Sequence, residues 1–283
     1  MLIILGALIV SASVITGYVA HGGNLAVLWQ PFEILIIFGA AGGAFISANN
    51  MHTIKAVAGA WPRLLSGTPF NRAFYLDLLS LLYDLFDKSR KQGVMAIEAD
   101  VDDPHESQIF TRYPAIMKNG PLLDFITDYL RIISAGNMAA HELEGLMDQE
   151  IEMRLHELEE PSHAVTQVAD GLPALGIVAA ILGIIITMGH LGGSTEQVGA
   201  LIAAALAGTL MGIWAAYGYV GPIAISMGRQ AKEEIKAYEC AKNAILATVS
   251  GQAPQMAIEF GRKVLNTDSR PNFQQLDDHV RSK

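Results

Sequence analysis

Positive charge is missing from two long parts of the 283-residue chain. No Lys or Arg occurs in residues 1–54 or 170–228, and all 19 fall in residues 55–154 and 229–283. The net charge of −9 makes nucleic acid an unsuitable partner. The single cysteine, Cys240, excludes an internal disulfide and a cysteine-rich metal site. Half of the residues are hydrophobic and only 17% are charged, a composition typical of a protein that lies partly in a membrane.

Signatures of enzymes are also missing. His141 and His156 each precede a glutamate, as in a zinc-protease helix, but Gly145 and Glu160 stand where the second histidine is required. The acidic residues within 142–160 lack the spacing of a calcium loop, and no glycine-rich phosphate loop occurs. The sequence therefore predicts a protein that is not an enzyme and has no cofactor or metal.

Four apolar segments are long enough to cross a membrane as helices, which takes about 20 residues each. They are Leu2–Ala20, Phe32–Ala48, Gly171–Leu191 and Val198–Ser226. The first could be a signal peptide, but no basic residue precedes it and further spans follow, which favours a membrane helix. Glu33, in the first turn of the second span, is interpreted as an interfacial cap rather than a buried ion site.

The polar parts of the chain are expected to be helical as well. Periodicity predicts helices over Ala73–Arg90, Pro121–Ser134, His141–Glu160, Gln230–Val249 and Met256–Leu265, and a mobile C-terminal end. No segment alternates with the period of a strand. The predicted architecture is an all-α membrane protein with spans one and two (1–51), a large helical insertion (52–169), spans three and four (170–228) and a helical tail (229–283).

The distribution of basic residues predicts the topology. By the positive-inside rule, the insertion, the tail and both termini are cytoplasmic, and the loops 21–31 and 191–198 lie outside. The insertion holds many more acidic than basic residues, so a basic or mixed-charge protein is a better partner for it than anionic lipid.

Spans three and four hold no carboxylate, although proton conduction through hydrocarbon requires a titratable group. If the chain conducts protons, a carboxylate must come from another chain. Small residues recur at every fourth position of span four, and Gly176 and Ala180 show the same spacing in span three. Such stripes let helices approach closely, so we expect the partner helix to pack here. The stripe in span four comprises Ala200, Ala204, Gly208, Gly212 and Ala216.

Two prolines frame this pair of spans. Pro173 is expected in the first turn of span three, where proline is ordinary. Pro222 should interrupt one backbone hydrogen bond near the end of span four and permit a kink. Together they suggest that motion passes from the membrane to the insertion.

At these residues the sequence resembles the MotA family, the larger stator subunit of the bacterial flagellar motor, essentially from end to end. The residues that carry the resemblance are Gly171–Ala180, Ala215–Gly218 with Gly221-Pro222, Met138–Glu152, Ala257–Lys263 and Tyr75–Arg90.

The resemblance implies a proton channel in the bacterial inner membrane. Five copies would surround two helices of a MotB-like partner, whose aspartate supplies the missing carboxylate. Sodium-driven relatives usually have Gly-Thr where this chain has Ala179-Ala180, which favours protons here. Thr209 matches a threonine of the conducting path.

The resemblance also implies roles for charged residues and prolines. Arg90 and Glu98 match residues that face the rotor protein FliG, and Pro173 and Pro222 match the conformational prolines. Three alternatives remain open: an energy-coupling module like ExbB or TolQ, which usually has three spans; a membrane scaffold; and, for Arg90, a simple ion pair with Asp87. Ala180 and Thr209 could serve packing alone.

Overall fold

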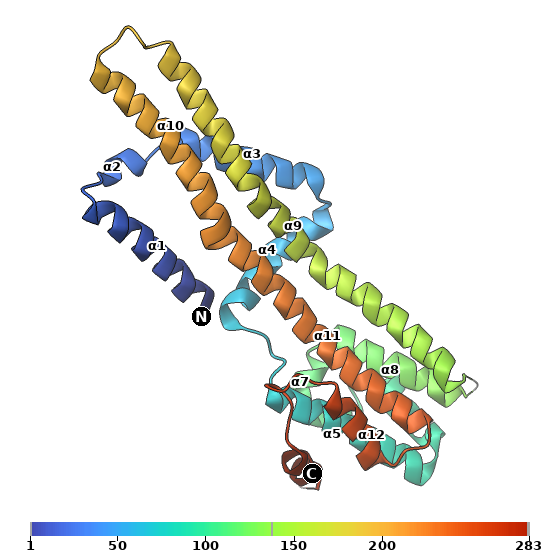
Figure 1. The fold of residues 1–283 in the computed structure, drawn as a ribbon. Helices are drawn as coiled ribbons and strands as arrows, with labels where there is room; N and C mark the ends of the chain where they lie inside the picture. The colour runs from blue at the N-terminus through green and yellow to red at the C-terminus, as the bar shows by residue number, and fades with distance from the viewer. Residues whose placement is uncertain (1, 137, 282–283) are drawn as a thin grey trace. The chain divides into compact units, whose positions relative to one another are not determined.

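The computed structural model describes residues 2–136 and 138–281, and within these ranges the chain is helical with no strand (Figure 1). The membrane-type and connecting helices of the first part are α1 (Leu2–Ala20), α2 (Leu25–Leu28), α3 (Pro31–Ala48) and α4 (Met51–Ser66). The middle part contains α5 (Arg72–Gln92), η1 (Val94–Ile97), α6 (Glu98–Asp102), η2 (Phe110–Arg112), α7 (Pro114–Met117) and α8 (Gly120–Ala135). The last part contains α9 (Ala140–Met188), α10 (Thr195–Ala215), η3 (Ala216–Val220), α11 (Gly221–Val249), α12 (Pro254–Lys263) and α13 (Phe273–Arg281).

Four helices are long and apolar enough to cross a membrane, as the sequence predicted. The first, α1, has the predicted bounds, and α3 begins at Pro31, a favourable first helical position. The other two are longer than predicted. Span three is the end of the 49-residue helix α9, and span four continues through η3 into α11 up to Val249.

The placement of Pro173 in a first turn was wrong. Pro173 lies deep inside α9, as does Pro161, and the helix that was predicted over His141–Glu160 runs on into span three without a break. A proline inside a helix removes one backbone hydrogen bond and bends the axis, but neighbouring contacts can keep the helix continuous.

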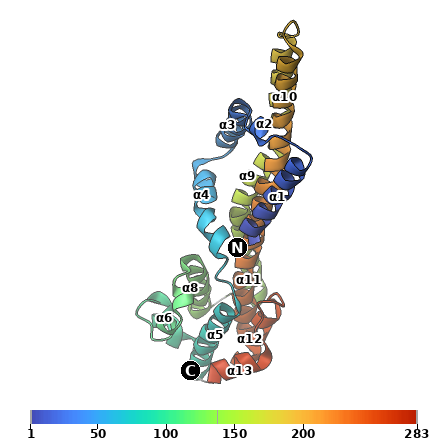
Figure 2. The same ribbon diagram turned by 90° about the vertical axis from the view of Figure 1, so that its left-hand side faces the viewer.

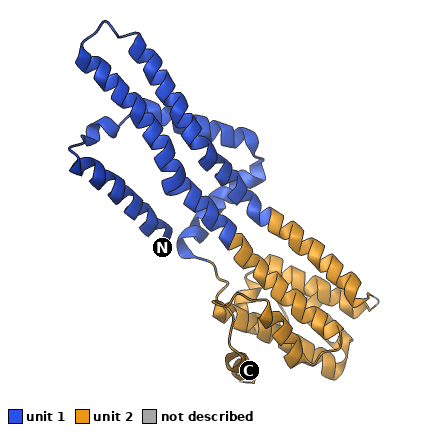
Figure 3. Cartoon of the chain, viewed as in Figure 1, with its two compact units in different colours: residues 1–67, 157–229 blue, residues 68–156, 230–283 orange. Residues whose placement is uncertain are grey.

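The chain divides into two compact units, which Figure 3 shows in different colours. Unit 1 comprises residues 1–67 and 157–229, and unit 2 comprises residues 68–156 and 230–283. These boundaries differ from the expected limits at residues 52 and 170. The boundaries shift because of α4, a helix that was not predicted. Its Leu64 packs with Val165 and Ala224 in an apolar cluster, and this contact places α4 in unit 1.

Unit 2 is built around α5, which was predicted over nearly the same residues. Asn71 caps the helix by accepting a hydrogen bond from the Phe74 amide at 3.1 Å. Leucines at helical spacing then form a stripe that is fully shielded from solvent. The helices α7, α12 and α13 pack against α5. Figure 2 shows α12 and α13 beside α5.

Phe273–Arg281, part of the C-terminal end that was expected to be mobile, form the helix α13. Its Leu276 is only 2% exposed, and His279 Nε2 lies 3.5 Å from Asp77 Oδ1 of α5. The prediction failed because the segment is short and mostly polar, and because its stability depends on contacts distant in sequence.

Leu82→Ala should destabilise unit 2 by about 2–5 kcal/mol, because the residue is fully buried and its loss leaves a cavity. The measurement is thermal unfolding of the purified chain in detergent, followed through protease cleavage within residues 68–156. Leu146→Ala is the control, since Leu146 is 40% exposed and its truncation should cost about 0.5 kcal/mol or less. Equal destabilisation by the two variants would contradict the described core.

Candidate functional site

Two membrane helices of unit 1, α9 and α10, approach each other closely enough for their backbones to touch. A Cβ atom placed on Gly176 would lie 3.1 Å from the Gly208 carbonyl oxygen and 3.2 Å from Gly212 Cα. A Cβ atom on Gly212 would lie only 2.6 Å from the carbonyl oxygen of Leu172. Any side chain larger than hydrogen at these positions would force the helices apart. We call this contact the α9–α10 seam.

The seam is antiparallel and extends over about two helical turns, since seven residues separate Gly176 from Gly183. A Cβ on Gly183 would lie 2.8 Å from the Cβ of Ala205, so Gly183 meets Ala205 as Gly176 meets Gly212. Figure 1 shows the two helices running side by side along this stretch. The spacing of Gly176, Gly208 and Gly212 predicted contact with the helix of another chain. In the structure, they form the contact between two helices of the same chain.

The other two residues predicted for the ion path also lie in these helices. Thr209 Cα is 3.4 Å from the position of a Cβ on Gly176, and the Thr209 side chain is half-buried. Ala180 is 8% exposed. Its neighbour Ala179 contacts the seam, because the Ala179 Cβ lies 3.3 Å from the position of a Cβ on Gly208.

Glu33 of α3 also reaches the seam, a contact that was not predicted. Its Cγ and Cβ lie 3.4 and 3.6 Å from the position of a Cβ on Gly208. Gly208 follows Thr195, the first residue of α10, by thirteen residues, which is about 20 Å along the helix. The interpretation of Glu33 as an interfacial cap did not include this contact. The available signal was that Glu33 is the single charged residue of segment 1–54.

After the seam, at the C-terminal end of α10, the fourth span changes its helical pitch. The π-helical turn η3 directly precedes Pro222, whose missing N–H interrupts the backbone ladder at the predicted place. The hydroxyl groups of Ser11 and Tyr219 share a hydrogen bond of 2.6 Å, which holds η3 against α1. On the other side of Pro222, Ser162 of α9 donates a hydrogen bond to the Ala224 carbonyl oxygen at 2.8 Å.

Arg90 and Glu98, in unit 2, are both exposed, and neither makes an ion pair with a residue that the structure describes. The pairing of Arg90 with Asp87 was wrong, since Asp87 Oδ2 accepts a hydrogen bond from Lys91 Nζ at 2.7 Å. Arg90 stands at a groove of about 350 Å³ whose walls include Ile97. Both charged groups are thus available to a partner.

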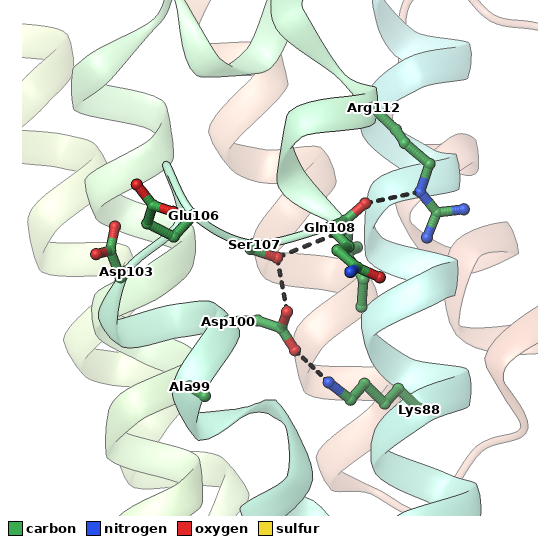
Figure 4. A pocket seen from close by; sticks show the side chains of 9 residues that line it. Lys88, Ala99, Asp100, Asp103, Glu106, Ser107, Gln108 and Arg112 are labelled. Carbon is green, nitrogen blue, oxygen red and sulfur yellow. Dashed lines mark hydrogen bonds and ion pairs between the residues drawn. The ribbon is translucent and has the colours of Figure 1, made fainter.

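A buried polar network near Glu98 fixes the short helix α6 (Figure 4). Asp100 is 8% exposed; its Oδ2 accepts a hydrogen bond from Lys88 Nζ and its Oδ1 one from Ser107 Oγ, each at 2.6 Å. The Ser107 Oγ in turn accepts a hydrogen bond from the Ile109 amide at 3.1 Å. This network joins α6 to α5, the helix that carries Arg90. No local pattern in the sequence predicts this network, because the three side chains come from separate segments.

Burial keeps two tyrosines and the single cysteine of unit 2 neutral at physiological pH. Burial raises the pKa of Tyr238 to about 12, and burial also raises the pKa of the Cys240 thiol and of Tyr75 far above their ordinary values. These groups would destabilise unit 2 only as the pH rises above about 9, where first the cysteine and then the tyrosines ionise in the unfolded chain. Within the residues that the structure describes, no cluster of possible metal ligands occurs.

Comparison with protein families gives two matches along the chain. Residues 4–93 match the model described as motility protein A N-terminal, and residues 118–240 match the MotA/TolQ/ExbB proton channel family. Three similar proteins are motility protein A of Salmonella typhimurium (45% identical over 282 residues), motility protein A of Escherichia coli (44%) and chemotaxis protein LafT of Vibrio parahaemolyticus (38%). The first two alignments cover 100% of this chain and 96% of each relative; the third covers 96% of both.

Solved structures resemble this fold over nearly its whole length. The MotAB structure from C. jejuni aligns with a TM-score of 0.78 at 19% identity, covering 96% of this chain and 98% of the other. The flagellar MotAB stator complex from Bacillus subtilis aligns with a TM-score of 0.69 at 25% identity, covering 90% and 92%.

Gly212→Ala should disrupt the α9–α10 seam, because its Cβ would collide with backbone atoms of Leu172 and Gly176, which cannot move independently of α9. We expect a cost of about 1–3 kcal/mol and less folded protein in detergent. Size-exclusion chromatography measures the amount of folded protein, and the midpoint temperature of thermal unfolding measures the loss of stability.

Gly199→Ala is the matched control, since it lies in the same helix and, among the described residues, no atom outside its own helical turn lies within 4 Å of the added Cβ. The close seam would be refuted if the two alanine variants behaved alike.

Proposed function

The chain belongs to the motility protein A family of flagellar stator subunits, and on that basis we propose that it assembles with a MotB-like single-span partner into an ion-driven torque generator. The observation that carries this proposal is the similarity to motility protein A along the entire chain. The family is one of proton channels in the inner membrane, so the chain is a multi-pass membrane protein and not an enzyme.

The stator assignment is preferred over an ExbB- or TolQ-like energy-coupling module. The second family match includes all of these proteins, but the first, over residues 4–93, is specific to motility protein A. That region holds α1 and α3, the two spans before the insertion. The four spans also distinguish this chain from the usual three of the energy-coupling proteins.

The proposed assembly is a ring of five copies around two partner helices. The apolar parts of α9 and α10 contain no carboxylate, so the aspartate that accepts the proton is supplied by the partner. Protons rather than sodium ions are the conducted species, because Ala179 and Ala180 lack the hydroxyl group that would serve as a sodium ligand. Ala180 and Thr209 border the ion path in this arrangement.

The proposed orientation places both termini, the insertion and the tail in the cytoplasm, in accord with the positions of the Lys and Arg residues. Arg90 and Glu98 then face the rotor, where opposite charges of FliG attract them. Pro173 and Pro222 transmit conformational change out of the membrane.

Expression of this chain with its MotB-like partner should restore swimming to a flagellated bacterium that lacks stators. Rotation should stop when an ionophore collapses the proton gradient, and it should continue in sodium-free medium. The measurement is the rotation speed of tethered cells. Absence of rescue, or rotation that persists without a proton gradient, would overturn the assignment.

Arg90→Glu should reduce the torque at high load by at least about twofold, because like charges then face each other at the rotor. The partner should still co-purify with the variant, since the Arg90 side chain is exposed. Lys91→Ala is the control: Lys91 is the next residue, is also exposed, and makes only a surface ion pair of little energetic value. A variant Arg90→Glu with full torque would contradict the rotor contact.

A further inference from the structure

Unit 2 contains an apolar groove beside Arg90. Its floor consists of buried apolar side chains from four elements: Phe86 of α5, Ile97 of η1, Leu130 of α8 and Ile245 of α11. None of the four is more than 3% exposed. The volume of about 350 Å³ is near the lower limit for pockets that hold small molecules, and it has room for a large side chain. Because four packed elements form the floor, the groove is a fixed feature of the unit 2 core.

The mouth of the groove is open because two helices end beside it. Helix α5 ends at Gln92 and is followed by Gly93 with φ +90°, and α11 ends at Val249, shortly before Gly251 with φ +84°. Glycine adopts such angles at no steric cost. The turn after α5 brings Val94 to the mouth, where it is 40% exposed. A large apolar side chain left in water beside an apolar groove indicates a surface for contact.

The single charged side chain that lines the groove is positive. Arg90 is exposed at the groove and makes no ion pair with a residue that the structure describes. No acidic residue is part of the lining. A complementary occupant therefore presents an apolar side chain to the floor and a carboxylate to the Arg90 guanidinium group, which binds carboxylates through two parallel hydrogen bonds.

We propose that this groove receives an apolar side chain of the rotor protein, next to the carboxylate that pairs with Arg90. The inference rests on the proposed function, since it extends the rotor contact from charge to apolar packing. An ion pair between exposed groups contributes little and is screened by salt. An apolar side chain that leaves water stabilises the contact without such screening. The charges thus guide the approach of the rotor, and the groove holds its surface in place under load.

The test measures the Kd of the purified rotor protein for the purified assembly of this chain with its partner, at about 0.15 M and about 1 M salt. Val94→Trp should fill the mouth of the groove and raise the Kd by at least about tenfold at both salt concentrations. Thr248→Trp should have the same effect, because Thr248 lines the groove from α11. Arg90→Ala should raise the Kd at the lower concentration only, because salt screens the charge contact.

Met95→Trp is the matched control. Met95 is the next residue after Val94, is 64% exposed and does not line the groove, so the Kd should change by less than about twofold. Equal Kd values for the two tryptophan variants would overturn the inference, as would an effect of Val94→Trp that disappears at the higher salt concentration.

Two further measurements keep the test decisive. If Val94→Trp failed to fold, Val94→Ser would take its place, and an unchanged Kd in that variant would overturn the inference. Size-exclusion chromatography checks the assembly: if Val94→Trp dispersed it, the groove would be a contact between copies of this chain, and the inference would be wrong. Failure of the unmodified assembly to bind the rotor protein would instead refute the rotor contact in the proposed function.

Discussion

The contact of backbone with backbone between α9 and α10 is the constraint on which the membrane part of this protein depends. In lipid, two apolar helices gain nothing from leaving water, so they associate through close packing. Glycine at 176, 208 and 212 brings the two backbones within van der Waals distance. The positions of Thr209, Ala179 and Glu33 follow from that approach. Larger side chains at the three glycine positions would separate the helices and change the distances among Thr209, Ala179 and Glu33.

Unit 2 is held together by a different force. Its core consists of large side chains removed from water, such as the leucine stripe of α5, and burial of apolar area supplies the stability. Helix α9 takes part in both kinds of packing. Its N-terminal half presents Leu143, Met147 and Ile151 to the core of unit 2, and its C-terminal half presents Gly176 and Gly183 to the seam. One continuous helix therefore changes from large to small residues as the surrounding medium changes from water to lipid.

The sequence predicted those features that depend on local pattern. The absence of charge identified four spans, and periodicity identified α5 and α8 nearly to the residue. It failed where distant contacts decide. Pro173 indicates a helix start, yet α9 is continuous because packing compensates for one lost hydrogen bond. Similarly, α13 depends on burial against α5, and the hydrogen bonds from Lys88 and Ser107 to Asp100 join three separate segments of unit 2. The three seam glycines were recognised as packing residues, but spacing alone could not name the helix that they contact.

The structure also indicates where unit 1 can bend. Tyr219 is held by Ser11 on one side of Pro222, and Ala224 is held by Ser162 on the other side. Between these two fixed points lie the end of the π-helical turn η3 and a proline without an N–H, so the backbone ladder is weakest there. A displacement of α10 at the seam would therefore be absorbed at Pro222 rather than spread evenly along the helix.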